Sequence, residues 1–129
     1  MRITNWMTRN PVCVGPADTL AKAGAVMATG GFRQLPVVEN GRLVGIITDR
    51  DLRQQAISES APVSSAMTTS PISISPSDTA ETAARIIIER KIGALPVVED
   101  GTVVGIVTTS DLLKALLNVV RAAQEIVRR

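Results

Sequence analysis

The sequence repeats itself at a shift of 60 residues without a gap. Between positions 7 and 52, the first copy is identical to the second at 19 of 46 aligned positions. The longest shared run is LPVVE, at 35–39 and 95–99, and GIIT at 45–48 recurs as GIVT at 105–108. Identity of this extent indicates a duplicated structural unit, so the chain is expected to fold as two copies of one small plan.

Each copy predicts a strand followed by a helix. The alternating run at 12–14, and its counterpart at 72–74, is typical of a short strand. The helices are expected at residues 19–29 and 79–90. Asp18 and Asp78 are the predicted N-caps, with Glu81 completing a capping box in the second copy.

A hairpin and a second helix complete each copy. Two apolar runs flank Asn40-Gly41 in the first copy and Asp100-Gly101 in the second. These dipeptides tolerate the positive φ angles of a type I′ turn. A further helix is expected to begin near Asp49 and near Thr109, which gives the order β-α-β-β-α.

The predicted fold class is α+β, with two β-α-β-β-α repeats packed sheet to sheet as a pseudo-two-fold pair. The first repeat is placed at 1–57, a linker at 58–64, and the second repeat with an extended C-terminal helix at 65–129. A unit of about 60 residues buries only ~60% of its unfolded surface, so we expect the repeats to share one core. Trp6 and Phe32 are the only aromatic residues, which makes that core aliphatic.

The last helix is longer than its repeat requires. From Asp111 to about Val127 it carries Leu112, Leu116, Val119, Val120, Ala123, Ile126 and Val127. This spacing predicts one apolar stripe. We expect the stripe to cover the N-terminal segment with Ile3, Trp6 and Met7, or to contact a second chain in a homodimer.

The segments MTxxPVxV, LPVVExG and GIITDRD occur in this order, and the second copy repeats them with small changes. Together they resemble the CBS domain, named after cystathionine β-synthase, over residues 1 to about 117. The layout is similar to that of small bacterial and archaeal proteins made of two CBS repeats. The resemblance implies two clefts, each combining the early strand and LPV region of one repeat with the GxxTxxD segment of the other.

The resemblance also implies the ligand-binding residues of both clefts. The first cleft would use Thr8, Val12, Cys13, Phe32, Arg33, Gln34, Leu35 and Pro36 with Thr108, Ser110 and Asp111. The second would use Thr68, Ile72, Ser73, Gly93, Ala94, Leu95 and Pro96 with Thr48, Asp49, Arg50 and Asp51. The implied ligand is AMP, ADP, ATP, S-adenosylmethionine or a related adenosyl compound, bound as an effector and not as a resident cofactor.

The residue types support such a site. Thr48 and Asp51 lie where a strand turns into a helix, and free N–H groups at a helix start favour phosphate. A carboxylate can accept from two ribose hydroxyls, and Arg50 offers a cationic fork. The alternative is that the aspartates are only early-helix charges and the threonines only N-caps. Arg33 is equally consistent with plain surface, and Cys13 is expected to be a small buried hydrophobe.

The two clefts are not equivalent in charge. Ser110 occupies the position that corresponds to Arg50, and Gly93 the position that corresponds to Arg33. Arg50 lies within the expected phosphate-binding turn, whereas Arg33 would reach across from another strand. We therefore expect the cleft with Asp51 to bind a phosphorylated ligand more tightly.

The favoured function is a ligand-sensing regulatory module whose state an unidentified effector protein reads. The alternative is a structural module that dimerises without ligand. An enzyme is not expected, because the chain has no His, its one Cys has no evident base, and no P-loop or metal motif occurs.

Other partners are disfavoured by charge and hydropathy. A net charge of +2 and the absence of a recognition motif argue against a nucleic-acid partner. The sequence has no run of 18 apolar residues, and the first ten residues lack the apolar stretch of a signal peptide. We therefore expect no membrane partner and a cytoplasmic location.

Overall fold

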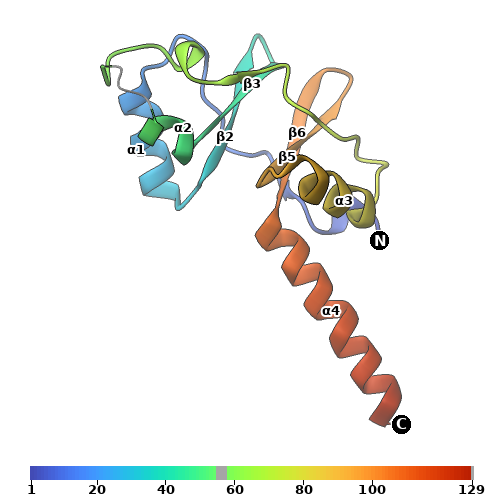
Figure 1. Ribbon diagram of the computed structural model, residues 1–129. Helices are drawn as coiled ribbons and strands as arrows, with labels where there is room; N and C mark the ends of the chain where they lie inside the picture. Colours follow the sequence, from blue (N-terminus) through green and yellow to red (C-terminus); the bar gives the residue numbers. More distant parts are fainter. Residues whose placement is uncertain (55–57, 129) are drawn as a thin grey trace.

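The computed structural model describes residues 1–54 and 58–128. The first repeat comprises η1 (Ile3–Asn5), β1 (Thr8–Arg9), α1 (Leu20–Gly30), β2 (Gln34–Glu39), β3 (Arg42–Thr48) and α2 (Asp49–Gln54). The second comprises η2 (Val63–Ser65), β4 (Thr68–Thr69), α3 (Ala80–Arg90), β5 (Ala94–Glu99), β6 (Thr102–Thr108) and α4 (Thr109–Arg128). The predicted boundary at residue 57 and the last residue, 129, lie outside the described residues. The α+β class is confirmed, and Figure 1 shows the two repeats as adjacent lobes.

Both predicted hairpins are confirmed. β2 pairs antiparallel with β3, and β5 with β6. Asn40 and Gly41 have φ angles of 52° and 80°, and Asp100 and Gly101 have the same values. Positive φ at both central residues is the requirement of a type I′ turn, so these two dipeptides fix the register of the strands that follow.

The repeats are joined by an exchange of short strands. β1 of the first repeat pairs with β6 of the second, with Thr8 opposite Ile106. β4 of the second repeat pairs with β3 of the first, with Thr68 opposite Ile46. A direct pairing between β3 and β6 completes a sheet of six strands.

Two glycines permit this exchange. A Cβ on Gly105 would lie 3.0 Å from the carbonyl oxygen of Thr8, and one on Gly45 would lie 2.9 Å from that of Thr68. A methionine sulfur would be 2.6 Å away in each case. The exchanged strands can approach only because these positions carry no side chain.

Two hydrophobic cores replace the single shared core that we expected. The first contains Val14, Leu20, Ala23, Met27, Leu35, Val37, Ile47 and Val63. The second contains Ile3, Ile74, Ala80, Ala83, Ile87, Leu95, Val97 and Val107. Ile3 and Val63 are both 0% exposed, and each packs into the core of the other repeat. The expectation was wrong because η1 and η2 cross over together with the strands that follow them; Val63 lies within the predicted linker.

The predicted N-caps are wrong by one residue. Thr19 Oγ1 accepts from the N–H of Lys22 at 3.1 Å, and Thr79 Oγ1 accepts from the corresponding N–H at 3.1 Å. Asp18 instead accepts from the N–H of Gly15 at 2.7 Å. This bond, together with the hydrogen bond from Lys22, lowers the pKa of the Asp18 carboxyl. The aspartate therefore closes the turn before the helix, and the threonine caps the helix itself.

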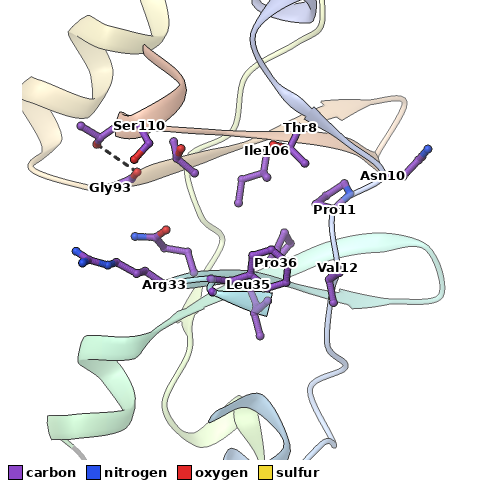
Figure 2. A pocket seen from close by; sticks show the side chains of 15 residues that line it. Thr8, Asn10, Pro11, Val12, Arg33, Leu35, Pro36, Gly93, Ile106 and Ser110 are labelled. Atoms are coloured by element: carbon purple, nitrogen blue, oxygen red, sulfur yellow. Dashed lines mark hydrogen bonds between the residues drawn. The ribbon is translucent and has the colours of Figure 1, made fainter. Parts of the chain in front are cut away.

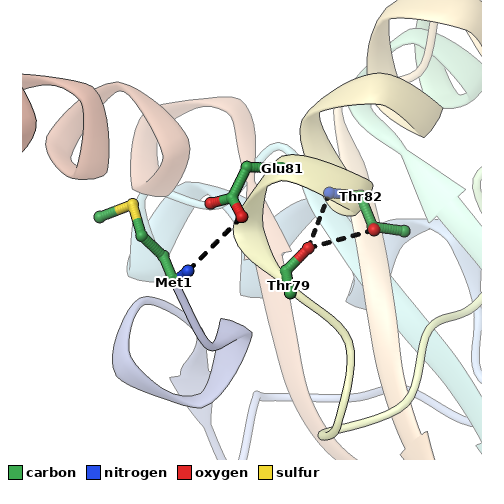
Figure 3. Close-up of polar contacts among 4 residues, drawn as sticks. All are labelled: Met1, Thr79, Glu81 and Thr82. Atoms are coloured by element: carbon green, nitrogen blue, oxygen red, sulfur yellow. Dashed lines mark hydrogen bonds and ion pairs between the residues drawn. The ribbon is translucent and has the colours of Figure 1, made fainter.

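Asp78 behaves in the same way, so Glu81 does not complete a capping box with it. The Asp78 carboxylate accepts from a backbone N–H three residues earlier, at 2.7 Å. Glu81 Oε2 lies 3.4 Å from the amine of Met1 (Figure 3). The carbonyl of Met1 accepts from the N–H of Ala80 at 2.9 Å, and Ile3 N–H donates to the carbonyl of Asp78 at 3.0 Å. The N-terminal residues are therefore fastened to the start of α3.

The predicted strand at 12–14 is reduced to a single bridge. Val14 pairs in parallel with Val37, and its carbonyl accepts from the N–H of Val38 at 2.8 Å. Ile74 and Val97 form the corresponding bridge in the second repeat. The regular pairing falls earlier, in β1 and β4, because those residues reach the neighbouring repeat.

The long C-terminal helix is confirmed. α4 has 20 residues and projects away from both lobes (Figure 1). Leu112 packs against the second core together with Trp6 and Met7, and Ala115 is buried. The N-terminal segment thus covers only the beginning of the stripe, and α4 is exposed from 116 to 128. Within 1–54 and 58–128, no helix is long and apolar enough to cross a membrane.

Candidate functional site

A cavity of about 640 Å³ opens between the two repeats (Figure 2). The first repeat lines it with Thr8, Asn10, Pro11, Val12, Gly31, Phe32, Arg33, Gln34, Leu35 and Pro36, and the second with Gly93, Ile106, Thr108, Thr109 and Ser110. Small-molecule sites commonly have volumes of about 300–1,000 Å³, so a nucleotide-sized ligand fits this space.

The cavity matches the first predicted cleft closely. Nine of the eleven residues assigned to that cleft line it, and only Cys13 and Asp111 do not. Gly93, assigned to the second cleft, also lines it. The structure therefore brings these residues together, while their role in binding stays a prediction.

Five lining residues were not predicted from the sequence: Asn10, Pro11, Gly31, Ile106 and Thr109. Ile106 reaches the cavity because β1 pairs with β6, and nothing local in the sequence signals that pairing. Thr109 directly follows a predicted residue, and its N–H donates to the carbonyl of Gly93 at 3.1 Å. Adjacency to Thr108 was the available signal for Thr109.

Asp111 is not among the lining residues of the cavity, but it is hydrogen-bonded to Thr108, which is. Its Oδ2 accepts from the Thr108 N–H at 2.9 Å and from Thr108 Oγ1 at 3.1 Å. The Asp111 N–H donates back to Thr108 Oγ1 at 3.3 Å. This reciprocal pair caps α4, so the N-cap reading of the threonine is confirmed. Within the described residues, Oδ1 of Asp111 makes no hydrogen bond and can still accept one from a ligand.

Thr48 and Asp51 repeat this geometry at the start of α2. Asp51 Oδ2 accepts from the Thr48 N–H at 2.9 Å, and the Asp51 N–H donates to Thr48 Oγ1 at 3.0 Å. Asp49 donates its N–H to the carbonyl of Arg33 at 2.8 Å, and its carboxylate lies 3.5 Å from Arg53. The Thr-Asp pairs are therefore alike in the two repeats, and the differences lie in the residues around them.

The remaining residues of the second cleft differ in exposure. Ile72 is exposed, whereas Leu95 and Pro96 are fully buried, as are Leu35 and Pro36 of the first cleft. The Leu-Pro pairs thus belong to the core, and only their backbone or edges are available to a ligand. The assignment of Thr68, Ser73, Ala94 and Arg50 to a ligand site stays a prediction.

Arg33 is the only charged residue in the described wall of the cavity. Neutral polar groups of Gln34, Thr109 and Ser110 share the wall, and apolar surface comes from residues such as Val12 and Ile106. The wall combines one cation with the N-terminal end of a 20-residue helix, at Ser110, and both the charge and the helix dipole favour an anionic group. The apolar surface suits a flat ring.

Gly93 leaves room for a side chain of the other repeat. A Cβ on Gly93 would lie 2.7 Å from Nε2 of Gln34. Gln34 can therefore extend across the boundary between the repeats, which brings residues of both into one wall.

Cys13 is half-buried, and its Sγ donates to the carbonyl of Pro11 at 3.3 Å. Burial raises the pKa of this thiol, so it is held in its neutral form. This agrees with the expected small hydrophobe, although the side chain is less buried than that expectation required.

Comparison with known proteins identifies the repeats. A family model described as the CBS domain matches residues 3–58 and again 63–118. The chain is 32% identical over 114 residues to the CBS domain-containing protein YhcV of Bacillus subtilis (strain 168), a match covering 85% of this chain and 81% of that protein.

Two solved structures share the whole arrangement. The crystal structure of AcuB from Vibrio cholerae has a TM-score of 0.85 and 30% identity, over 97% of this chain and 96% of that chain. CBSX2, a CBS-pair protein from Arabidopsis thaliana, has been solved in complex with AMP. That complex has a TM-score of 0.82 and 31% identity, over 92% of this chain and 97% of that chain.

Proposed function

The chain belongs to the CBS domain family, of which it carries two copies, and on this premise we propose that it is a regulatory module whose cavity binds an adenine nucleotide or related adenosyl ligand. The observation that carries the proposal is the cavity between the repeats, whose wall combines the start of α4 with Arg33, the one charged lining residue in the described part of the chain. The likeness to CBSX2, solved in complex with AMP, supports the class of ligand.

The proposed orientation follows the chemistry of the wall. A phosphate or other anionic group lies near Arg33 and the N–H of Ser110 at the start of α4. The ribose lies toward Asp111, whose Oδ1 accepts from its hydroxyls. The adenine ring lies against Val12 and the other apolar lining residues.

In this proposal the protein has no catalytic activity of its own. Binding instead changes a shape or an association that an effector protein reads, and the module acts in the cytoplasm as a homodimer. No nucleic acid or membrane takes part. The competing candidate, a structural module that dimerises without ligand, is favoured by the exposed stripe of α4.

A thermal-shift panel of AMP, ADP, ATP, S-adenosylmethionine and NAD separates the two candidates. A ligand that binds only the folded state adds about 2.7 kcal/mol to the free energy of unfolding at 100 times its Kd. For a chain of this size, that raises the Tm by several degrees. A guanine nucleotide serves as the control ligand. A flat response across the panel from a dimeric protein would favour the structural module.

A further inference from the structure

Two methionines lie against the glycines that receive the exchanged strands. Met7 directly precedes β1, and its Sδ would be 2.6 Å from a Cβ on Gly105 of β6. Met67 directly precedes β4, and its Sδ would be 2.6 Å from a Cβ on Gly45 of β3. At these distances the sulfur fills the place that a side chain on the glycine would take, so each thioether seats one exchanged strand on its partner.

Each methionine also anchors the segment that crosses between the repeats. The Met7 N–H donates to the carbonyl of Ile3 at 2.9 Å, and the Met67 N–H donates to that of Val63 at 3.0 Å. Met7 packs against the core that Ile3 enters, and Met67 packs against the core that Val63 enters. Both methionine side chains are half-buried, so they make apolar contacts and are still within reach of a small solute.

A thioether in this position can be oxidised by hydrogen peroxide. A lone pair of Sδ attacks one peroxide oxygen, an S–O bond forms and the O–O bond breaks. The proton of the transferred oxygen passes to the departing one, which leaves as water, so the sulfur loses two electrons and the peroxide gains them. The sulfoxide is larger and more polar than the thioether, and such a group disrupts apolar contacts. Because the sulfur already touches a glycine, we expect the new oxygen to force the side chain off its seat.

The other two methionines of the chain provide an internal comparison. Met27 is only 5% exposed in the first core, so we expect peroxide to reach it slowly. Met1 is 44% exposed, and it is fastened to α3 through its amine and its carbonyl, which oxidation of the sulfur leaves in place. Met7 and Met67 therefore combine access to peroxide with a structural consequence of oxidation.

Met7 is also the methionine that leads into the cavity wall. Thr8 and Val12, which follow it, line the cavity together with Ile106, the partner of Thr8 in β6. Met67 leads into β4, which is not part of the described wall. Loss of the seat at Met7 would therefore loosen one side of the cavity, whereas loss of the seat at Met67 would act on the fold alone.

We propose that Met7 and Met67 are sites of oxidation by hydrogen peroxide, and that the sulfoxide at Met7 releases β1 from β6 and so opens the wall of the cavity. Enzymatic reduction of the sulfoxide restores the seat, which makes the methionine a reversible switch. The oxidation sites are independent of the proposed function, whereas the effect of Met7 on a ligand rests on it.

Thermal denaturation of three peroxide-treated proteins tests the two seats: the wild type, the double variant Met7→Leu/Met67→Leu, and the matched control Met1→Leu. Leucine keeps an apolar side chain of similar volume that peroxide does not oxidise. Peptide mass spectrometry follows oxygen uptake at each methionine, and Cys13 is present in all three proteins, so its oxidation contributes equally. We expect uptake at Met7 and Met67 well before Met27. We expect the Tm to fall by about 5 °C or more in the wild type and in Met1→Leu, but not in the double variant.

Reduction by the sulfoxide reductases for both epimers should return the Tm to its starting value. An equal fall in all three proteins would overturn the proposal, as would complete oxidation of Met7 and Met67 with an unchanged Tm. Uptake at these two residues no faster than at Met27, or a lowered Tm that persists after the sulfoxides have been reduced, would also overturn it.

The effect on the cavity is tested by titrating AMP into two single variants before and after peroxide treatment. Met67→Leu retains only the seat at Met7, and Met7→Leu only the seat at Met67. If β1 is released in about nine of ten molecules, the apparent Kd rises about tenfold. We expect that rise for Met67→Leu and little change for Met7→Leu.

An AMP Kd that treatment leaves unchanged in Met67→Leu would overturn the link to the cavity, and the proposed function would stand. If no ligand of the panel binds the untreated wild type, the link fails together with the proposed function. The Tm measurements still decide the oxidation sites in that case.

Discussion

The two Thr-Asp pairs can serve the fold and a ligand site with different atoms of the same residues. In each, one carboxylate oxygen and the threonine hydroxyl are used in capping a helix, as the bonds between Thr108 and Asp111 show. The other carboxylate oxygen of Asp111 points to no described partner. A helix-capping role and a ligand-binding role are therefore compatible in these residues. We expect the affinity for a ligand to depend on the side chains around them.

Arg33→Ala should weaken AMP binding about tenfold or more while leaving adenosine binding nearly unchanged, because a hydrogen bond to a charged group is worth about 1.5–3 kcal/mol. Calorimetry with both ligands measures the difference. Arg85→Ala removes an exposed arginine of α3 that lies outside the cavity, and it is the matched control. An equal loss for adenosine and AMP would contradict a phosphate role for Arg33.

The ranking of the clefts is a second prediction at this scale. The ranking made from the sequence predicts that Asp51→Ala removes most high-affinity binding of a phosphorylated ligand and that Asp111→Ala leaves it largely intact, because Arg50 would contact the phosphate directly. The proposed site at Arg33 predicts the reverse. Calorimetric titration of both variants decides this. Arg33 lines the same cavity as Ser110 and could supply the positive charge that Ser110 lacks. A larger loss of affinity for Asp111→Ala than for Asp51→Ala would reverse the ranking.

At the level of elements, the sequence predicted the hairpins and helices, because these depend on residues that are close together in the chain. The hairpins followed from Asn40-Gly41 and Asp100-Gly101, whose positive φ angles the structure contains. The first helix of each repeat followed from its capping residues, with an error of one residue at the N-cap because threonine and aspartate are both good caps. The strand exchange was missed, because two-residue strands carry no periodicity and their partners lie in the other repeat.

The residues that line the candidate site also divide into those that the sequence predicted and those that it did not. Residues such as Leu35 and Ser110 were predicted because they lie in motifs that the family resemblance covers. Asn10 was missed although it lies between the predicted residues Thr8 and Val12, and that adjacency was the available signal. Ile106 was missed because it joins the wall through the pairing of β1 with β6. A one-dimensional pattern contains no record of that contact.

The strand exchange leads to a prediction about Gly45 and Gly105, which lie against the exchanged strands. Gly105→Ala and Gly45→Ala should each lower the free energy of unfolding by about 1–3 kcal/mol, because the new Cβ collides with the backbone of the exchanged strand. Gly24→Ala is the control, since its Cβ would lie 3.6 Å from Leu52 in ordinary contact and helix interiors prefer alanine. Urea denaturation measures all three, and a neutral Gly105→Ala would contradict the close approach.

Over the whole molecule, the exchange of Ile3 and Val63 ties two small cores into one cooperative unit. Neither repeat can be complete without a residue from a segment of the other. We therefore expect a single unfolding transition for the whole chain, despite the two separate clusters.

Ile3→Ala should cost about 2–5 kcal/mol and shift that one transition as a whole, because it leaves a cavity in a filled core. Ile88→Ala, at a side chain that is 74% exposed on α3, should change the free energy of unfolding little. Urea denaturation followed by circular dichroism and by Trp6 fluorescence gives two probes of the transition. Two separate steps, with only one moved by Ile3→Ala, would contradict the reciprocal arrangement.

The central claim, a ligand site between the repeats, is tested most directly by isothermal titration of nucleotide-free protein with AMP and with the other adenine and adenosyl compounds of the panel. The account predicts saturable binding of at least one of them, with an affinity that falls in Arg33→Ala and not in Arg85→Ala. An absence of binding heat and of any rise in Tm across the panel would contradict it.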